Sequence, residues 1–217
     1  MKNLLGTVLL LGLSFSLLAE SVPHDPNQIR PLLPGQQAPE FSAIDARGET
    51  FRFDPAALER PAVIIFYRGG WCPFCNLYWA ELRKFEDQLM AMDLDLIFLS
   101  ADSAEVIAEA MVDAEDQPEY HLLSDSSSEI AAKFGIAFRL DDATYERYVE
   151  RGVDLEVWAG GYAHHNLPVP ATFIVGTDGV IRFQYVNPNY KVRLHPEVLL
   201  AAARTMPEYE IKRPEKD

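Results

Sequence analysis

Basic side chains are scarce in this chain of 217 residues, which has 19 lysines and arginines against 33 acidic residues and a formal net charge of −14. Nucleic acids and anionic lipid surfaces are bound by clustered lysine and arginine. The composition therefore argues against both as partners. Cysteine is scarcer still, since Cys72 and Cys75 are the only two.

A long membrane-spanning run is also missing. Lys2 precedes an apolar stretch over residues 4–18, which is shorter than the roughly 20 residues of a transmembrane helix. Small residues follow, so residues 1–21 are predicted to be a secretory signal peptide, cleaved after Ala19 or Ser21. An uncleaved anchor is the alternative. No cysteine follows the run, which argues against a lipid-modified N-terminus, and we expect an exported protein, periplasmic or extracellular, with no stable membrane insertion after cleavage.

The rest of the chain is long enough for one domain with a hydrophobic core. Residues 23–39 contain five prolines, and residues 22–35 are expected to form an extended lead-in with little structure of its own. A domain over residues 36–205 and a loose, charged tail over residues 206–217 complete the predicted organisation.

Strand and helix patterns alternate through this domain, which predicts an α/β fold with parallel strands and helices on the sheet faces. Residues 41–53 read as a hairpin, residues 62–67 and 94–100 as buried strands, and residues 120–123 as a short strand. Capping patterns at residues 102–105 and 126–129 predict two helix starts, and Gly135 predicts the end of the second helix. A hairpin over residues 168–186 and a helix from Pro196 follow.

The chemistry of the chain is concentrated at Cys72 and Cys75, which lie between a buried strand and an amphipathic segment. A plain structural disulfide would close a very small loop and constrain the unfolded chain little. A zinc site using His164 and His165 would normally bring a second spaced pair of ligands, whereas these histidines are adjacent. A redox-active pair is the favoured interpretation, and the other two remain open.

A thiol at a helix N-terminus faces unpaired backbone N–H groups and the positive end of the helix dipole, which favour the thiolate. Pro73 suits the first turn of such a helix. Cys75 would follow nearly one turn later, within reach of any bond that Cys72 forms with a substrate. Arg68, Gly69 and Gly70, just upstream, are expected to bring a cation and a close backbone approach to the same place, and a solvated loop residue is the equally weighted alternative for Arg68.

Residues 136–168 interrupt the alternation of strands and helices. They include a polar helical segment around Tyr145 and Tyr148 and end near His164 and His165. An insertion of this size in a compact domain is predicted to be a lid or a binding segment. For the two histidines, surface polar residues are the favoured interpretation, and proton donors the alternative.

Three motifs carry a family resemblance: Trp71 to Cys75 after an apolar strand, the Val169-Pro170 segment before a Thr-Asp-Gly turn, and the lead-in at residues 35–41. With residues 66–69 and 187–193, this order resembles the thioredoxin superfamily. Within it, the chain is most similar to the peroxiredoxin-like branch related to alkyl hydroperoxide reductase and thiol-specific antioxidant proteins. The resemblance extends over residues 35–203.

The resemblance implies a thioredoxin-like fold, a central mixed sheet flanked by helices, with the insertion before the hairpin that carries a cis-proline, Pro170. It implies that Cys72 attacks the O–O bond of a hydroperoxide and that Cys75 resolves the product. Trp71, Pro73, Val169 and Pro170 would be supporting residues, and a thioredoxin-like dithiol the external reductant. No cofactor and no metal are expected.

The chain departs from the peroxiredoxin pattern at three positions. Ile65 and Gly69 stand where that pattern has a proline and a threonine, and Pro170 stands where an activating arginine normally opens the later strand. Arg68 would replace that charge. Because the Cys-Pro-Phe-Cys pair is closer to glutaredoxin and thioredoxin motifs, disulfide exchange with exported proteins is the alternative function. A thioredoxin-fold binding module with a structural disulfide is a third.

Overall fold

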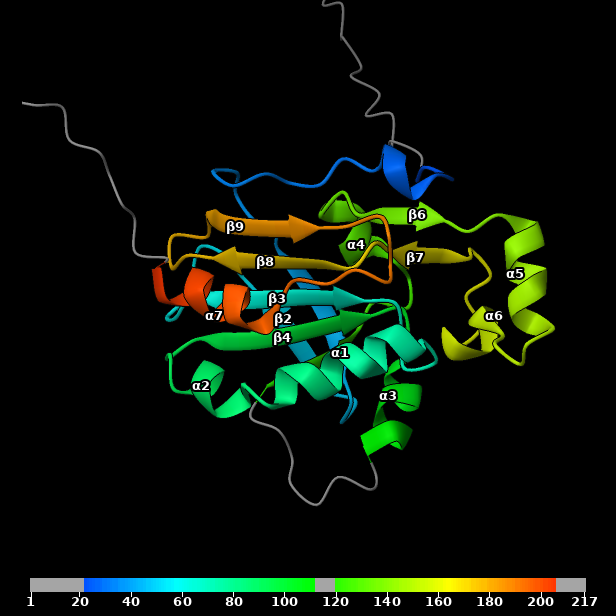
Figure 1. Cartoon of the computed structure of the whole chain (residues 1–217), viewed down its shortest axis with the longest axis horizontal. Helices are drawn as coiled ribbons and strands as arrows, with labels where there is room; N and C mark the ends of the chain where they lie inside the picture. The colour runs from blue at the N-terminus through cyan, green and yellow to red at the C-terminus, as the bar shows by residue number, and fades with distance from the viewer. Residues whose placement is uncertain (1–21, 112–119, 206–217) are drawn as a thin grey trace, which may run out of the picture.

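A seven-stranded mixed sheet in the order β2-β1-β5-β4-β3-β8-β9 forms the centre of the protein (Figure 1). This computed structural model describes residues 22–111 and 120–205. The signal peptide and the charged tail predicted from the sequence lie outside these residues. The strands are β1 (Phe41–Asp45), β2 (Thr50–Phe53), β3 (Ala62–Tyr67), β4 (Asp95–Ser100), β5 (His121–Ser124), β6 (Ala137–Arg139), β7 (Asn166–Pro168), β8 (Ala171–Val175) and β9 (Ile181–Val186).

The helices alternate with these strands, as the sequence predicts. They are the 3₁₀ turn η1 (Pro26–Gln28) and the α-helices α1 (Pro73–Arg83), α2 (Glu86–Met90), α3 (Ala104–Met111), α4 (Glu129–Lys133), α5 (Asp142–Val149), α6 (Leu155–Trp158) and α7 (Pro196–Thr205). None of the helices in residues 22–111 and 120–205 is long and apolar enough to cross a membrane.

The strand β3 lies between β4, to which it is parallel, and β8, to which it is antiparallel. All six of its residues are buried. Since successive side chains of a strand point to opposite faces, β3 contributes to two cores. Ile64 and Phe66 join one core, and Val63 and Ile65 join the other. This explains why the sequence shows a continuous apolar run there and no alternation.

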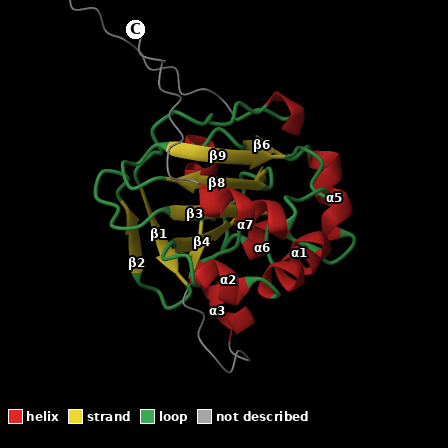
Figure 2. Ribbon diagram, turned by 60° about the vertical axis from the view of Figure 1, so that its left-hand side comes forward, coloured by secondary structure: helices red, strands yellow, loops and turns green. Residues whose placement is uncertain are grey.

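Helices cover both faces of the sheet. Figures 1 and 2 show α1, α2 and α7 together on one face, where Leu82 of α1 and Leu199 of α7 are buried in the same core. On the other face, α4 packs against β3 through Phe134, whose ring lies 5.1 Å from that of Phe66. The insertion forms α5 and α6, which lie together beyond the small β6-β7 sheet (Figure 1).

Two helix starts differ from the predicted capping boxes. Asp125 caps α4 through its carboxylate, which accepts hydrogen bonds from the N–H groups of Ile130 and Ala131, at 2.9 and 2.7 Å. Among the serines at residues 126–128, Ser127 adds one long contact, in which its hydroxyl accepts from the Glu129 N–H at 3.4 Å. At α3 the Ser103 hydroxyl accepts from the Val106 N–H, because the carboxylate of Asp102 points instead to the turn before Cys72.

The predicted cis bond at Pro170 is wrong, since no cis peptide bond occurs in the described residues. The chain runs from β7 into β8 in an extended conformation. The Val169 N–H donates to the Ile136 carbonyl at 2.9 Å, and the Pro170 carbonyl accepts from the Asn187 N–H at 3.3 Å. This direct passage needs no tight turn, so the usual preference of about 0.5–1 kcal/mol for the trans form prevails.

The lead-in is more firmly attached than its proline content suggests. Its backbone N–H groups at Arg30 and Leu32 donate to the carbonyls of Gly135 and Phe134, at 3.0 and 3.1 Å. Gly135 has a φ of +70°, and a Cβ there would lie 1.9 Å from the Arg30 carbonyl oxygen. A glycine is therefore required both to end α4 and to admit the lead-in.

Candidate active site

Cys72 lies between the end of β3 and the start of α1, as predicted from the sequence. It is the N-cap residue of α1, and Pro73 is the first residue of the helix. The Cys72 N–H donates to the Gly69 carbonyl at 3.1 Å, and the Cys72 carbonyl accepts from the Cys75 N–H at 2.9 Å. Both sulfur atoms are thereby held in the first turn of the helix, and both are present as free thiols.

The two thiols share one proton unequally. Each cysteine is only 1% exposed. A hydrogen bond from the Cys75 thiol, the Cys75 backbone N–H and the charges of Arg68 and Arg193 together lower the pKa of Cys72 to about 6, against the opposing effect of burial. The hydrogen bond to Cys72, together with burial, raises the pKa of Cys75. Cys72 is therefore the thiolate at neutral pH, and Cys75 keeps its proton.

Arg68 directly follows β3 and is 3% exposed. Its guanidinium carbon lies 4.4 to 5.6 Å from the ring centroids of three aromatic side chains, those of Trp71, Tyr148 and Tyr190. Nη2 donates to the Tyr148 hydroxyl at 2.8 Å, whereas Nε has no hydrogen-bond partner among the described residues. No carboxylate within that part of the chain pairs with Arg68. This aromatic cage stabilises the cation and leaves its charge available to Cys72.

Arg193 is a second cation at the site. It lies in the loop between β9 and α7, and its Nη2 is 3.4 Å from the sulfur of Cys75. Arg193 was not predicted from the sequence as a site residue, although it belongs to the segment at residues 187–193 that contributes to the family resemblance.

Asp102 fixes the turn that precedes Cys72. Its Oδ2 atom accepts from the Gly70 N–H at 2.8 Å and from the Ser100 hydroxyl at 3.1 Å. Burial raises the pKa of this carboxyl to about 6, although those two hydrogen bonds oppose the increase. Asp102 directly follows β4, which is parallel to β3. The sequence could have identified Asp102 as a site residue, because the carboxyl ends of parallel strands meet at one edge of a sheet.

Gly69 explains one departure from the peroxiredoxin pattern. Its φ is +150°, and a Cβ there would lie 2.4 Å from Nε1 of Trp71 and 2.5 Å from Oδ1 of Asp102. A threonine cannot occupy this position without moving those side chains.

Val169 and Pro170, which were predicted to form a cis-proline loop, line a cavity together with Arg68. Arg68, Pro170, Tyr148 and Tyr190 line a cavity of about 200 Å³. Its walls are mainly apolar, and Val169, which also lines it, is completely buried. The cavity places an open, apolar space beside the caged guanidinium.

The predicted binding segment contributes Tyr148, on α5, to the site. Its two histidines have other partners: His164 Nε2 lies 2.8 Å from the Ser126 carbonyl oxygen, and His165 Nε2 lies 2.8 Å from a carboxylate oxygen of Glu156. His165 also stacks on Tyr145, with 3.7 Å between ring centroids. His165 therefore holds the insertion together, whereas His164 links it to the segment before α4. The described residues contain no cluster of three His, Cys, Asp or Glu that could hold a metal ion.

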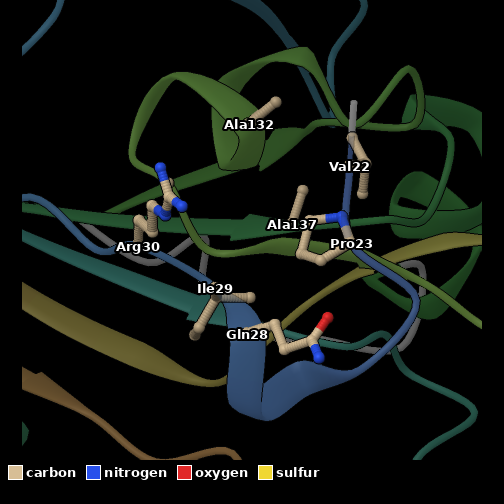
Figure 3. A pocket seen from close by; sticks show the side chains of 8 residues that line it. Val22, Pro23, Gln28, Ile29, Arg30, Ala132 and Ala137 are labelled. Atoms are coloured by element: carbon tan, nitrogen blue, oxygen red, sulfur yellow. The ribbon is translucent and has the colours of Figure 1, made fainter. Parts of the chain in front are cut away.

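A larger cavity of about 610 Å³ lies between the lead-in and the α4-β6 segment, lined by side chains that include Gln28, Ile29 and Arg30 (Figure 3). It contains neither cysteine. Neither cysteine lines the smaller cavity beside Arg68 either.

Comparisons with known proteins agree with this fold. The model of the AhpC/TSA family matches residues 34–184. No match is found among curated proteins. Peroxidoxin BcpB from Mycobacterium tuberculosis is 20% identical, with a TM-score of 0.59 over 81% of this chain and 98% of its own. A peroxiredoxin-like protein from Aquifex aeolicus is 17% identical, with a TM-score of 0.61 over 82% and 89%. A thiol peroxidase from Chromobacterium violaceum is 16% identical, with a TM-score of 0.60 over 81% and 88%.

The Gly69 backbone predicts a difference between two adjacent substitutions. Gly69→Ala should lower the free energy of unfolding by about 1–3 kcal/mol more than Gly70→Ala, because only the first introduces strain and a collision. A Cβ at Gly70 would have its nearest neighbour at 3.6 Å, an ordinary contact. Urea denaturation of both variants checks this, and equal losses would contradict it.

The shared proton predicts the titration of Cys72. The thiolate absorbance near 240 nm should titrate with a midpoint near pH 6, well below the value of about 8.5 for a free cysteine. Replacing Cys75 by alanine removes the strongest hydrogen bond to the thiolate, so the midpoint should rise. Cys72→Ser serves as the blank, and a wild-type midpoint near that of a free cysteine would refute the assignment.

Proposed function

Because the chain belongs to the AhpC/TSA family and is a thiol-dependent oxidoreductase, we propose that it is an exported peroxidase that reduces hydroperoxides at Cys72 and resolves the product with Cys75. The observation that carries this proposal is a buried thiolate at a helix N-terminus beside a caged arginine with no carboxylate partner in the described residues. Export is proposed from the leader pattern of residues 1–21.

In the first step the Cys72 thiolate attacks the outer oxygen of the hydroperoxide. An S–O bond forms and the O–O bond breaks, which leaves a sulfenic acid on Cys72 and an alkoxide or hydroxide that takes up a proton. The free Nε–H of Arg68 is available to donate to the departing oxygen as its negative charge develops. The apolar cavity beside Arg68 supplies room for the rest of the hydroperoxide.

In the second step the sulfur of Cys75 attacks the sulfur of Cys72. An S–S bond forms and the S–O bond breaks, and the departing hydroxide leaves as water with the proton of Cys75. The substrate has then been reduced by two electrons, and the two thiols have been oxidised to a disulfide. An external thioredoxin-like dithiol returns both cysteines to thiols by exchange and closes the cycle.

Disulfide exchange with exported proteins is the second candidate. The observation in its favour is the dithiol itself: an ionised Cys72 and a protonated Cys75 in the first turn of one helix. In that function Cys72 forms a mixed disulfide with the substrate, held against the backbone of Val169 and Pro170, and Cys75 releases it. The two candidates differ in the bond that Cys72 attacks first.

Stopped-flow mixing of the reduced protein with hydrogen peroxide or an organic hydroperoxide separates the candidates. A peroxidase should oxidise Cys72 more than roughly a hundredfold faster than a free thiol reacts, because the thiolate and Arg68 act together. The Cys75→Ser variant should stop at a sulfenic acid that dimedone traps, and Cys72→Ser should not react. A wild-type rate no faster than that of a free thiol would remove the peroxidase and leave disulfide exchange.

The proposed role of Arg68 has its own test. Arg68→Met should slow the oxidation of Cys72 by roughly a hundredfold, the usual scale for losing one preorganised donor to a developing oxyanion. Part of that loss comes from a higher Cys72 pKa, so rates are compared at pH 7 and again at pH 9. At pH 9 the Cys72 thiolate predominates, and a remaining defect measures the contribution of Arg68 to the transition state.

Tyr148→Phe is the matched control for Arg68. It keeps the ring of the cage and removes only the hydroxyl that accepts from Arg68 Nη2. Its rate should fall less than about tenfold, the scale of one hydrogen bond. Equal rates for wild type and Arg68→Met at pH 9 would exclude the donor role.

A further inference from the structure

Arg193 is held in a fixed position against the second sulfur. Its Nη1 donates to the backbone carbonyls of Tyr190 and Val192, the latter at 3.1 Å, while Nη2 points at Cys75 Sγ from 3.4 Å. No carboxylate among residues 22–111 and 120–205 forms an ion pair with it. Because Nη1 is occupied by carbonyls and no carboxylate neutralises the guanidinium in this part of the chain, Nη2 directs its positive charge at the sulfur of Cys75.

The sulfur whose negative charge Arg193 stabilises changes during the reaction. In the reduced protein Cys72 is the anion, and that anion keeps the proton on Cys75. Once Cys72 carries an oxygen or a second sulfur it is neutral, so the main interaction that held the proton on Cys75 is gone. Burial still raises the pKa of Cys75, and the groups that oppose burial and favour the thiolate are the backbone N–H of Arg68 and the guanidinium of Arg193.

We propose that Arg193 is a catalytic residue of the second step, in which its guanidinium stabilises the Cys75 thiolate that attacks the sulfur of Cys72. The inference rests on the proposed role of Cys75 as the second thiol. It does not depend on whether Cys72 first attacks an O–O or an S–S bond, because the attack by Cys75 on a neutral Cys72 sulfur is common to both functions.

The groups that act on Cys75 come from three elements besides the loop of Arg193. They are Cys72 at the start of α1, Tyr67 and Arg68 at the end of β3, and Asp102 after β4. Burial raises the pKa of Tyr67, so its phenol is neutral at physiological pH. Asp102 is an opposing negative charge. Arg193 is thus the one cationic side chain in hydrogen-bond contact with Cys75 in this part of the chain.

An aromatic disulfide reagent such as 5,5′-dithiobis(2-nitrobenzoate) isolates the second step without any peroxide. The Cys72 thiolate displaces one coloured thiolate and forms a mixed disulfide. Cys75 then attacks the Cys72 sulfur, forms the Cys72–Cys75 disulfide and displaces a second coloured thiolate. The first phase depends on reagent concentration, and the second, being intramolecular, does not.

Arg193→Gln should slow the second phase by roughly tenfold or more and shift its pH profile upward by about one unit, because an opposite charge at this distance lowers a thiol pKa by about 1–3 units. Arg193→Lys, which keeps the charge but not the fork, should give an intermediate rate. Lys191→Gln removes the same charge from the same loop without contacting a sulfur and should leave the second phase unchanged.

A second phase in Arg193→Gln as fast as in the wild type would overturn the proposal, as would an equal loss in Lys191→Gln. If Arg193→Gln does not fold, Arg193→Met takes its place, because it also removes the charge, and a second phase at the wild-type rate with an unshifted pH profile overturns the proposal as well. Slow oxidation of Cys72 by hydroperoxides would refute the peroxidase and leave this result unaffected.

Discussion

A negative charge on a nearly inaccessible sulfur is the constraint around which this protein is organised. Burial alone would keep the Cys72 thiol protonated, since a charge loses most of its hydration there. The fold compensates with a thiol donor from Cys75, a helix N-terminus and two arginines. These groups come from different parts of the fold: Cys75 lies within the first turn of α1, Arg68 directly follows β3, and Arg193 lies in the loop between β9 and α7. The start of α1 has to stay where it is for all of them to reach the same atom.

This constraint also accounts for the departures from the peroxiredoxin pattern. The threonine position is a glycine because the backbone turns beside Trp71 and Asp102. The later strand has a proline, Pro170, where the pattern has an arginine, and Arg68 brings a positive charge to the same cavity from the end of β3. The cation therefore reaches the site from the strand before the cysteines.

Sequence reasoning succeeded where the information is local. The apolar run over residues 62–67, the Pro73 start of α1 and the hairpins follow from side-chain periodicity and turn chemistry within a few residues. It failed at Pro170, whose trans bond depends on pairing with Ile136 and Asn187, and at α4, whose cap is Asp125 rather than a serine. The sequence also did not identify Tyr148, Tyr190 or Arg193 as site residues. Nothing near them in the chain indicates that they meet, because only the folded sheet brings them together.

Residues that meet at the site are far apart in the sequence, so the reactivity of Cys72 develops late in folding. Arg68 and Tyr148 are 80 residues apart, and Cys75 and Arg193 are 118 apart. Before the loop of Arg193 has docked, Cys72 and Cys75 are largely protonated, as ordinary cysteine thiols are at neutral pH, and are therefore weak nucleophiles. The enhanced nucleophile is therefore a product of complete folding, and a chain still in synthesis carries two cysteines of ordinary reactivity.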